Sequence, residues 1–225
     1  MTDLKWYEDS EVTLYKSNAC DLDVARAAWV SLDDEAHRKE AQVGRVEGLI
    51  NFLWNNGHTS PFEHGSFTFI VKTPIFVARE FMRHRTFSFN EVSGRYTELK
   101  PEFYRPNLDR PVVQEGKVGS YSFSPDDMLV GDARWDQESV AYEAWRRYES
   151  LVESGVAKEV ARMHLPLSLM TTFWATANPL NVLKFLTLRT DAQALYEIRS
   201  VASQMERLFE ECMPLTHAAW KGTRA

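Results

Sequence analysis

The sequence predicts an α+β fold, in which helices surround one sheet and residues 1–225 form a single domain. Strand-like alternation is confined to a few segments, helical spacing fills most of the remainder, and the two do not alternate regularly along the chain. A length of 225 residues with 44% hydrophobic side chains is enough to bury one sizeable core. No linker-like stretch divides the chain, so one domain is expected.

The first 72 residues are predicted to contain two helices between two strands. Residues 11–15 alternate like a strand, and Asp21 can cap the helix that follows. Residues 33–54 form a longer helical pattern, which Gly57 can end. In residues 65–72 the larger apolar side chains alternate with Ser, Thr and Ile, which predicts a strand.

The rest of the chain is predicted to be mostly helical. Pro74 suits the first position of a helix that leads into an arginine-rich motif. Residues 101–125 contain Pro, Gly and Ser without a clear period, which predicts a loop. From Pro125 onward the pattern is helical, with a long amphipathic stretch over residues 191–212. Its interruptions are at Gly155, Pro166 and Pro179.

Charge, cysteine count and hydropathy limit the classes of function. A net charge of −6 disfavours a surface built to bind a polyanion such as DNA, so an anion site must be local. Cys20 and Cys212 are too few for a secreted disulfide scaffold and too far apart for a short metal motif. The N-terminus has no signal-peptide core, and no apolar run reaches the roughly 18 residues of a membrane span. We therefore expect a cytoplasmic protein without membrane contact.

Arginines are concentrated in one short stretch of this acidic chain. Arg79, Arg83, Arg85 and Arg95 surround His84 in the sequence. Planar guanidinium groups match phosphate oxygens in pairs, so the cluster suits a nucleotide or a dinucleotide cofactor. The polar residues after it, among them Ser88 and Asn90, favour a binding site over a plain edge strand.

Two other interpretations of this stretch remain open at the level of the sequence. Arg83 and Arg85 could complement the negative end of the preceding helix, with Glu80 and Glu91 neutralising them. Alternatively, aromatic residues between the arginines could form a stacking platform for nucleic acid, although the stretch is short and the chain acidic. The aromatic residues concerned are Phe87, Phe89 and Tyr96.

The spacing of Arg83-His84-Arg85, seven intervening residues and Ser93 resembles the motif of the flavin-dependent thymidylate synthases. Four more stretches resemble this family in the same order: GHTSPFEH at 57–64, FVAREFM at 76–82, ARMHLPL at 161–167 and KFLTLR at 184–189. The resemblance implies a mostly antiparallel central sheet and a homotetramer with active sites shared between subunits. It also implies reductive methylation of dUMP to dTMP, with 5,10-methylenetetrahydrofolate as carbon donor, NADPH as reductant and FAD as hydride carrier, and without attack by a cysteine.

The resemblance also assigns roles to individual residues. Those that would contact the flavin are Ser31, His58, Ser60, Glu63, Arg83, His84, Arg85, Asn90, Glu91, Asn178 and Lys184. Those that would contact dUMP are Glu80, Arg83, Glu91, Ser93, Gly94, Arg95, Arg162 and Arg189. Arg189 matches the arginine thought to act on the uracil, where a fixed cation would stabilise negative charge as the ring is polarised. We therefore take it as the catalytic candidate, although it also precedes Asp191, a possible helix cap.

Three positions depart from the commonest family pattern. Glu80 stands where many members have Gln, which turns a group that donates and accepts into an acceptor only. Leu180 and Lys184 stand where some relatives place Arg and Asn or His, so contacts with the adenine end of FAD are expected to differ. Asn178 is retained.

The stretch at 57–64 has structural explanations too. Ser60, Pro61 and Glu63 could form a capping box, whether or not Ser60 also lies near the flavin. His58 and His64 share no helical face and have no third ligand nearby, so we expect no metal site.

Two functions from other classes compete with the enzyme. A regulatory protein could have kept the nucleotide pocket and lost the chemistry; flavin uptake and NADPH oxidation that depends on dUMP would tell the two apart. A small DNA-binding protein would instead show strongly salt-dependent affinity for duplex DNA.

Overall fold

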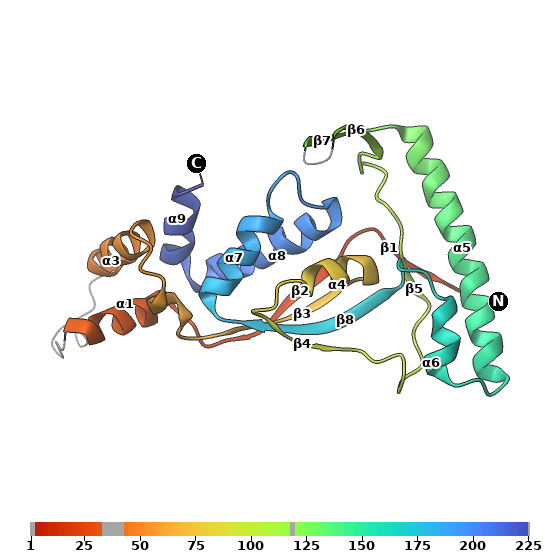
Figure 1. Ribbon diagram of the computed structural model, residues 1–225, viewed down its shortest axis with the longest axis horizontal. Helices are drawn as coiled ribbons and strands as arrows, with labels where there is room; N and C mark the ends of the chain where they lie inside the picture. The colour runs from red at the N-terminus through yellow and green to blue at the C-terminus, as the bar shows by residue number, and fades with distance from the viewer. Residues whose placement is uncertain (1–2, 33–42, 118–119, 225) are drawn as a thin grey trace.

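The computed structural model describes residues 3–32, 43–117 and 120–224 (Figure 1). Most of the first half of the helix predicted over residues 33–54 lies outside these ranges. Its second half is α3 (Val43–Asn55), and Gly57 follows with a φ of 70°, a left-handed conformation that glycine adopts without strain.

A four-stranded antiparallel sheet forms the centre of the molecule, with strand order β2-β3-β8-β4. Its strands are β2 (Glu11–Ser17), β3 (Phe67–Pro74), β8 (Met170–Ala177) and β4 (Ser88–Glu91). β3 and β8 pair along their whole length, from Phe67 opposite Ala177 to Pro74 opposite Met170. The predicted mixture of helices and strands with an antiparallel sheet is therefore confirmed.

Two smaller sheets accompany the central one. β1 (Lys5–Tyr7) pairs in parallel with β5 (Glu102–Tyr104), and β6 (Val113–Lys117) pairs with β7 (Ser120–Ser124). The prediction of a loop over residues 101–125 is therefore wrong for these three strands, whereas residues 105–112 between β5 and β6 form neither strand nor helix. β5 pairs with residues almost a hundred positions earlier, and such a partner leaves no periodicity within a local window.

The prediction that residues after Pro125 are helical is wrong for β8, a central strand of the sheet. The strand is rich in Thr and aromatic residues, which favour β structure. Phe173 and Ala175 are buried whereas Trp174 between them is partly exposed, as strand alternation requires. Pro166 and Pro179, predicted to interrupt the helical pattern, lie on either side of this strand.

Helices cover one face of the central sheet and gather at its two ends (Figure 1). Those over the face are α4 (Ile75–Phe81), α7 (Pro179–Arg189) and α8 (Tyr196–Cys212), with Phe67, Phe69 and Phe173 buried beneath them. At one end lie α1 (Asp21–Trp29), η1 (Val30–Leu32), α3, η2 (Ser60–Glu63) and α9 (Pro214–Gly222); at the other lie α5 (Asp127–Glu153), α6 (Lys158–Ala161) and η3 (Arg162–His164).

The opposite face of the sheet keeps apolar side chains in partial contact with solvent. Tyr15 and Trp174 pack there with ring centroids 4.4 Å apart, and their exposed fractions are 55% and 41%. Ile70 pairs directly with Trp174 on the same face. In the described part of the chain this face carries no covering helix, so the helices that surround the sheet lie over its other face and at its two ends.

Three predicted helix starts need correction. Asp21 is the first residue of α1, not its cap, and its carboxylate instead accepts hydrogen bonds from the backbone N–H groups of Leu215 and Thr216, both at 2.9 Å. It therefore caps α9, whose first N–H groups have no partner within the helix. Pro74 ends β3, and α4 begins one residue later. α8 begins at Tyr196 and not at Asp191. The Asp191 carboxylate accepts a hydrogen bond from the Gln193 N–H within a turn that precedes the helix.

In the described ranges no helix is both long enough and apolar enough to cross a membrane.

Candidate active site

Arg189, the last residue of α7, meets the end of α4 across more than one hundred residues of sequence. Its Nε donates a hydrogen bond to Nε2 of His84 at 2.9 Å, and its Nη1 forms an ion pair with the carboxylate of Glu80. The Arg189 and Glu80 side chains are 18% and 23% exposed. The guanidinium is therefore held from two directions in a partly buried place, which fixes its orientation.

His84 is a neutral partner in this cluster. Burial lowers the pKa of His84 to about 4, and the positive charges of Arg189 and Arg83 add to the effect. Above that pH the imidazole is uncharged, and Nε2 can accept the Arg189 N–H when the proton is on Nδ1. The ring also packs against Phe185, one helical turn before Arg189, with centroids 4.8 Å apart. We call Glu80, His84 and Arg189 the arginine cluster.

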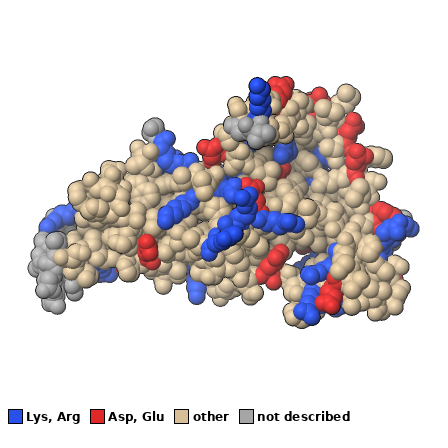
Figure 2. Space-filling view, in the orientation of Figure 1, with Lys and Arg blue, Asp and Glu red and all other residues tan. Residues whose placement is uncertain are grey.

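Basic side chains gather in the middle of one face of the molecule, where Figure 1 places α4 and α7 (Figure 2). The exposed basic residues of α4, α7 and the turn after α4 are Arg79, Arg83, Arg85 and Lys184. Within the described ranges, Arg83 and Arg85 form no salt bridge. Their guanidinium groups are therefore available to an anion.

Glu80 and Glu91 do not neutralise Arg83 and Arg85. Glu80 is paired with Arg189, and Glu91 accepts a hydrogen bond from the Thr171 hydroxyl at 2.6 Å. This part of the alternative is wrong because both carboxylates face partners brought close by the fold and not their neighbours in sequence. That Arg83 and Arg85 complement the negative end of α4 stays a prediction. The polarity of β4 also needs no special explanation, since it is the edge strand of the sheet and mostly exposed.

The residues after β4 form a compact turn. The Ser93 hydroxyl accepts the N–H of Arg95 at 3.3 Å, and the Ser93 carbonyl accepts that of Thr97 at 3.0 Å. A Cβ atom on Gly94 would lie 2.9 Å from Cδ1 of Leu99, so glycine allows the turn to pack closely. The Arg95 guanidinium pairs with Glu159 of α6 at 2.7 Å. Sequence reasoning did not anticipate this acidic partner, which lies 64 residues away.

The remaining predicted residues lie on three elements. Asn178 accepts the N–H of Asn181 at 2.9 Å and so caps α7, which also carries exposed Lys184 and the buried Leu180. Arg162 begins η3 and is exposed. Ser31 lies on η1 and is exposed. None of these side chains has a described contact with the arginine cluster.

The predicted capping box at Ser60 is wrong. Residues Ser60–Glu63 form a single 3-10 turn whose cap position is Thr59, and neither Ser60 nor Glu63 makes a capping hydrogen bond. The Ser60, Glu63 and His58 side chains are exposed instead, on a turn that adjoins α7. In the parts of the chain that the structure describes, no three His, Cys, Asp or Glu side chains are grouped to hold a metal ion.

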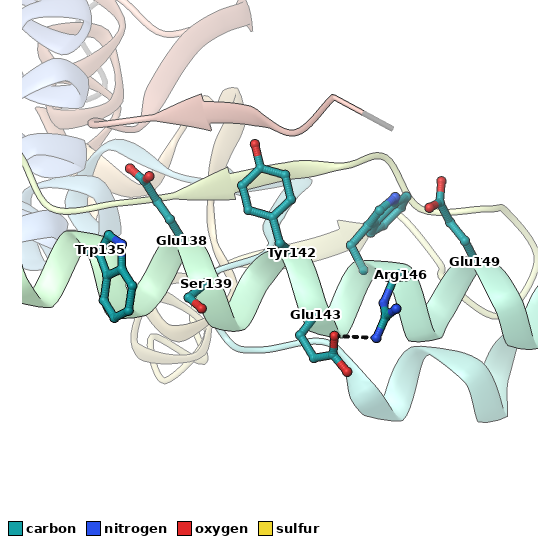
Figure 3. Close-up of a pocket in the computed structure, with 8 residues that line it drawn as sticks. Trp135, Glu138, Ser139, Tyr142, Glu143, Arg146 and Glu149 are labelled. Atoms are coloured by element: carbon teal, nitrogen blue, oxygen red, sulfur yellow. Dashed lines mark hydrogen bonds and ion pairs between the residues drawn. The ribbon is translucent and has the colours of Figure 1, made fainter. Parts of the chain in front are cut away.

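A wide hollow lies elsewhere, along α5 (Figure 3). Its volume is about 620 Å³, and it is lined by residues between Trp135 and Glu149. The carboxylate of Glu143 pairs with Arg146 at 2.8 Å, and that of Glu138 with Arg105 at 2.7 Å. The hollow contains none of the predicted site residues, and its lining combines three glutamates with one arginine.

Comparison with known proteins agrees with the motif. The family model of the thymidylate synthase complementing proteins, Thy1, matches residues 13–215. A flavin-dependent thymidylate synthase of Streptomyces coelicolor is 44% identical over 94% of this chain and 91% of its own, and one of Tropheryma whipplei is 40% identical over 94% and 93%. A crystal structure of the UMP/dUMP methylase PolB from Streptomyces cacaoi, bound with 5-Br dUMP, superposes with a TM-score of 0.91 at 39% identity, covering 97% of both chains. The chain therefore belongs to the Thy1 family, that of the flavin-dependent thymidylate synthases.

Proposed function

We propose that this protein converts dUMP to dTMP by reductive methylation, with 5,10-methylenetetrahydrofolate as carbon donor, NADPH as reductant and FAD as cofactor. The observation that carries the proposal is the arginine cluster, where two segments of the family motif converge on a fixed cation. A cation held in advance stabilises charge that develops on a substrate without reorganising at that moment. In this proposal Arg189 would act on the uracil ring as it is polarised.

The residues present fit a flavin cofactor. Arg83 and Arg85 are exposed and form no described salt bridge, which suits the pyrophosphate of FAD. His84, Asn90 and Glu91 would contact the same cofactor, as would Asn178 and Lys184 of α7 and the exposed group Ser31, His58, Ser60 and Glu63. When bound, FAD would supply the hydride for the reduction.

The nucleotide would be held by the turn after β4. The backbone at Ser93 and Gly94, together with Arg95, would bind dUMP, with Arg162 directed at the same nucleotide. Because Arg95 is already paired with Glu159, its bond to a phosphate would compete with that ion pair. Glu80 would orient Arg189 through their ion pair. If its carboxylate contacts dUMP, it would act only as a hydrogen-bond acceptor.

The assembly is proposed to be a homotetramer with shared active sites. Its support is the partly exposed apolar face around Tyr15, Ile70 and Trp174, which a second copy could cover. The candidate flavin residues on η1 and η2 also have no described contact with the arginine cluster, as expected if one site combines residues from several chains. The two free cysteines, Cys20 and Cys212, fit the reducing cytoplasm.

The test is an assay of the purified protein supplied with FAD, NADPH and the folate. We expect NADPH oxidation that depends on dUMP and yields dTMP, together with a flavin absorbance spectrum. Binding of FAD and dUMP without turnover would favour the regulatory protein instead, and tight, salt-dependent binding of duplex DNA would favour the nucleic-acid function. Because the similar PolB is described as a UMP/dUMP methylase, UMP is assayed beside dUMP.

A double variant tests where the flavin binds. His84→Ala with Arg85→Ala should reduce FAD uptake, since it removes a guanidinium from the proposed phosphate contacts. Arg207→Ala, on the exposed side of α8, is the matched control and should leave uptake unchanged. Equal FAD absorbance in both variants after reconstitution would show that the cofactor binds elsewhere.

A further inference from the structure

The last residues of the described chain contact the end of α7. Nε1 of Trp220 donates to the Thr187 hydroxyl at 2.9 Å, and that hydroxyl donates to the Leu183 carbonyl at 2.8 Å. The contact is thus relayed from a side chain of α9 to the backbone of α7, one turn earlier. The Trp220 side chain is buried, so this end of α9 is packed into the core.

Arg224 makes the same kind of relay through Thr190, the residue that follows α7. Its Nη1 donates to the Thr190 hydroxyl at 2.7 Å, and that hydroxyl donates to the Leu186 carbonyl at 2.7 Å. Nη2 also reaches the Thr187 carbonyl at 3.3 Å. The last carbonyls of a helix lack partners within it, and a cation at this end complements the helix dipole.

The strap formed by Trp220–Arg224 is itself anchored. The Arg224 guanidinium lies over the Trp220 ring, 4.8 Å from its centroid, and the Thr223 hydroxyl accepts Nε1 of Trp54 on α3 at 3.1 Å. Figure 1 shows α9 between α3 and the pair α7 and α8. The strap therefore connects the last turn of α7 to a neighbouring helix.

Arg189 lies between the two threonines that the strap holds. Its side chain contacts Glu80 and His84, whereas Thr187 and Thr190 are bound by the strap. We propose that Trp220 and Arg224 are positioning residues that hold the last turn of α7 so that Arg189 stays in its catalytic orientation. This inference rests on the role proposed above for Arg189.

The reason for such a strap is that helix ends fray. A terminal turn without added partners opens readily. Displacing a reacting group by about 1 Å can cost on the order of a hundredfold in rate. The strap supplies three hydrogen bonds to the turn in question without touching the side chain of Arg189.

The test is a double-mutant cycle between the strap and Arg189. Arg224→Ala should lower kcat roughly tenfold with little change in KM for dUMP, because the arginine acts on the orientation of another residue. Arg224→Lys should restore part of the loss, and Trp220→Phe, which lacks the N–H donor, should lower kcat less. Arg207→Ala is the control for losing an exposed arginine. In an Arg189→Lys background, Arg224→Ala should have no further effect.

Two results would overturn the inference. One is an equal loss of kcat from Arg224→Ala in both backgrounds, which would mean that the strap does not act through Arg189. The other is unchanged kcat together with unchanged hydrogen exchange of the amides at 186–190, which would mean that the strap does not hold the turn. Normal turnover of Arg189→Lys alone would instead count against the proposed role of Arg189, and the exchange measurement would still decide whether the strap restrains α7.

Discussion

Arg189 and Arg162 are both proposed to act on the nucleotide, yet their surroundings are opposite. Arg189 is 18% exposed and bound to Glu80 and His84, whereas Arg162 is exposed at the start of η3, without a described side-chain partner. A charge that must stabilise one position on a reacting ring is useful only if it is already oriented. A charge that attracts a phosphate needs no such restraint. The difference fits the catalytic role proposed for Arg189 and the binding role proposed for Arg162.

The largest expected effect is that of Arg189→Lys. Lysine keeps the charge but cannot bond to Glu80 and His84 with one planar group. We expect kcat for dTMP formation to fall by about 10²–10³, the usual cost of losing one preorganised donor, while FAD uptake remains. Steady-state kinetics at saturating dUMP measure it, and ordinary turnover would remove Arg189 from the catalytic role.

Arg162→Ala should affect binding instead. We expect KM for dUMP to rise on the order of tenfold, with kcat nearly unchanged, because the lost contact would exist equally in the bound substrate and the transition state. A fall in kcat as large as that of Arg189→Lys would break the distinction between the two arginines.

The low pKa of His84 allows a pH-dependent test, with a smaller expected effect than the two arginine variants. Its pKa is about 4 in the folded protein and near 6.5 in the unfolded chain, so the unfolded state binds more protons between these values. The His84 contribution to the free energy of unfolding is therefore complete above pH 6.5 and decreases as the pH falls towards 4. An NMR titration of the ring should show the low pKa.

The same titration compares the two arginines. Arg189→Gln should raise the pKa of His84, because a nearby positive charge is removed, whereas Arg162→Gln should not. A His84 that titrates near 6.5 in the wild-type protein would contradict the neutral partner assigned to Arg189.

The smallest effect is expected from Cys20→Ser with Cys212→Ser. Burial raises the pKa of both thiols; the Cys20 thiol also donates to Asp23 at 3.2 Å, and Glu211 adds to the shift at Cys212. Neither cysteine is thus activated as a nucleophile. We expect dTMP formation to persist with FAD and NADPH present. Loss of turnover in a variant that still binds FAD and dUMP would exclude a mechanism without cysteine attack.

The sequence by itself determined the features that depend on local spacing. The motif from Arg83 to Ser93 identified the family, the alternation at residues 65–72 predicted most of β3, and amphipathic spacing predicted α8. These predictions depend only on the spacing of residues within one element or one short motif, which the sequence shows directly.

Only the tertiary structure decided which distant residues meet. It made residues 170–177 a central strand, moved the capping role of Asp21 to α9, and paired Glu80 with Arg189 and not with its neighbouring arginines. The physical reason is the same in each case. Hydrogen bonds and ion pairs form with the nearest complementary group in space, and packing of the helices on one face of the sheet determines which group that is.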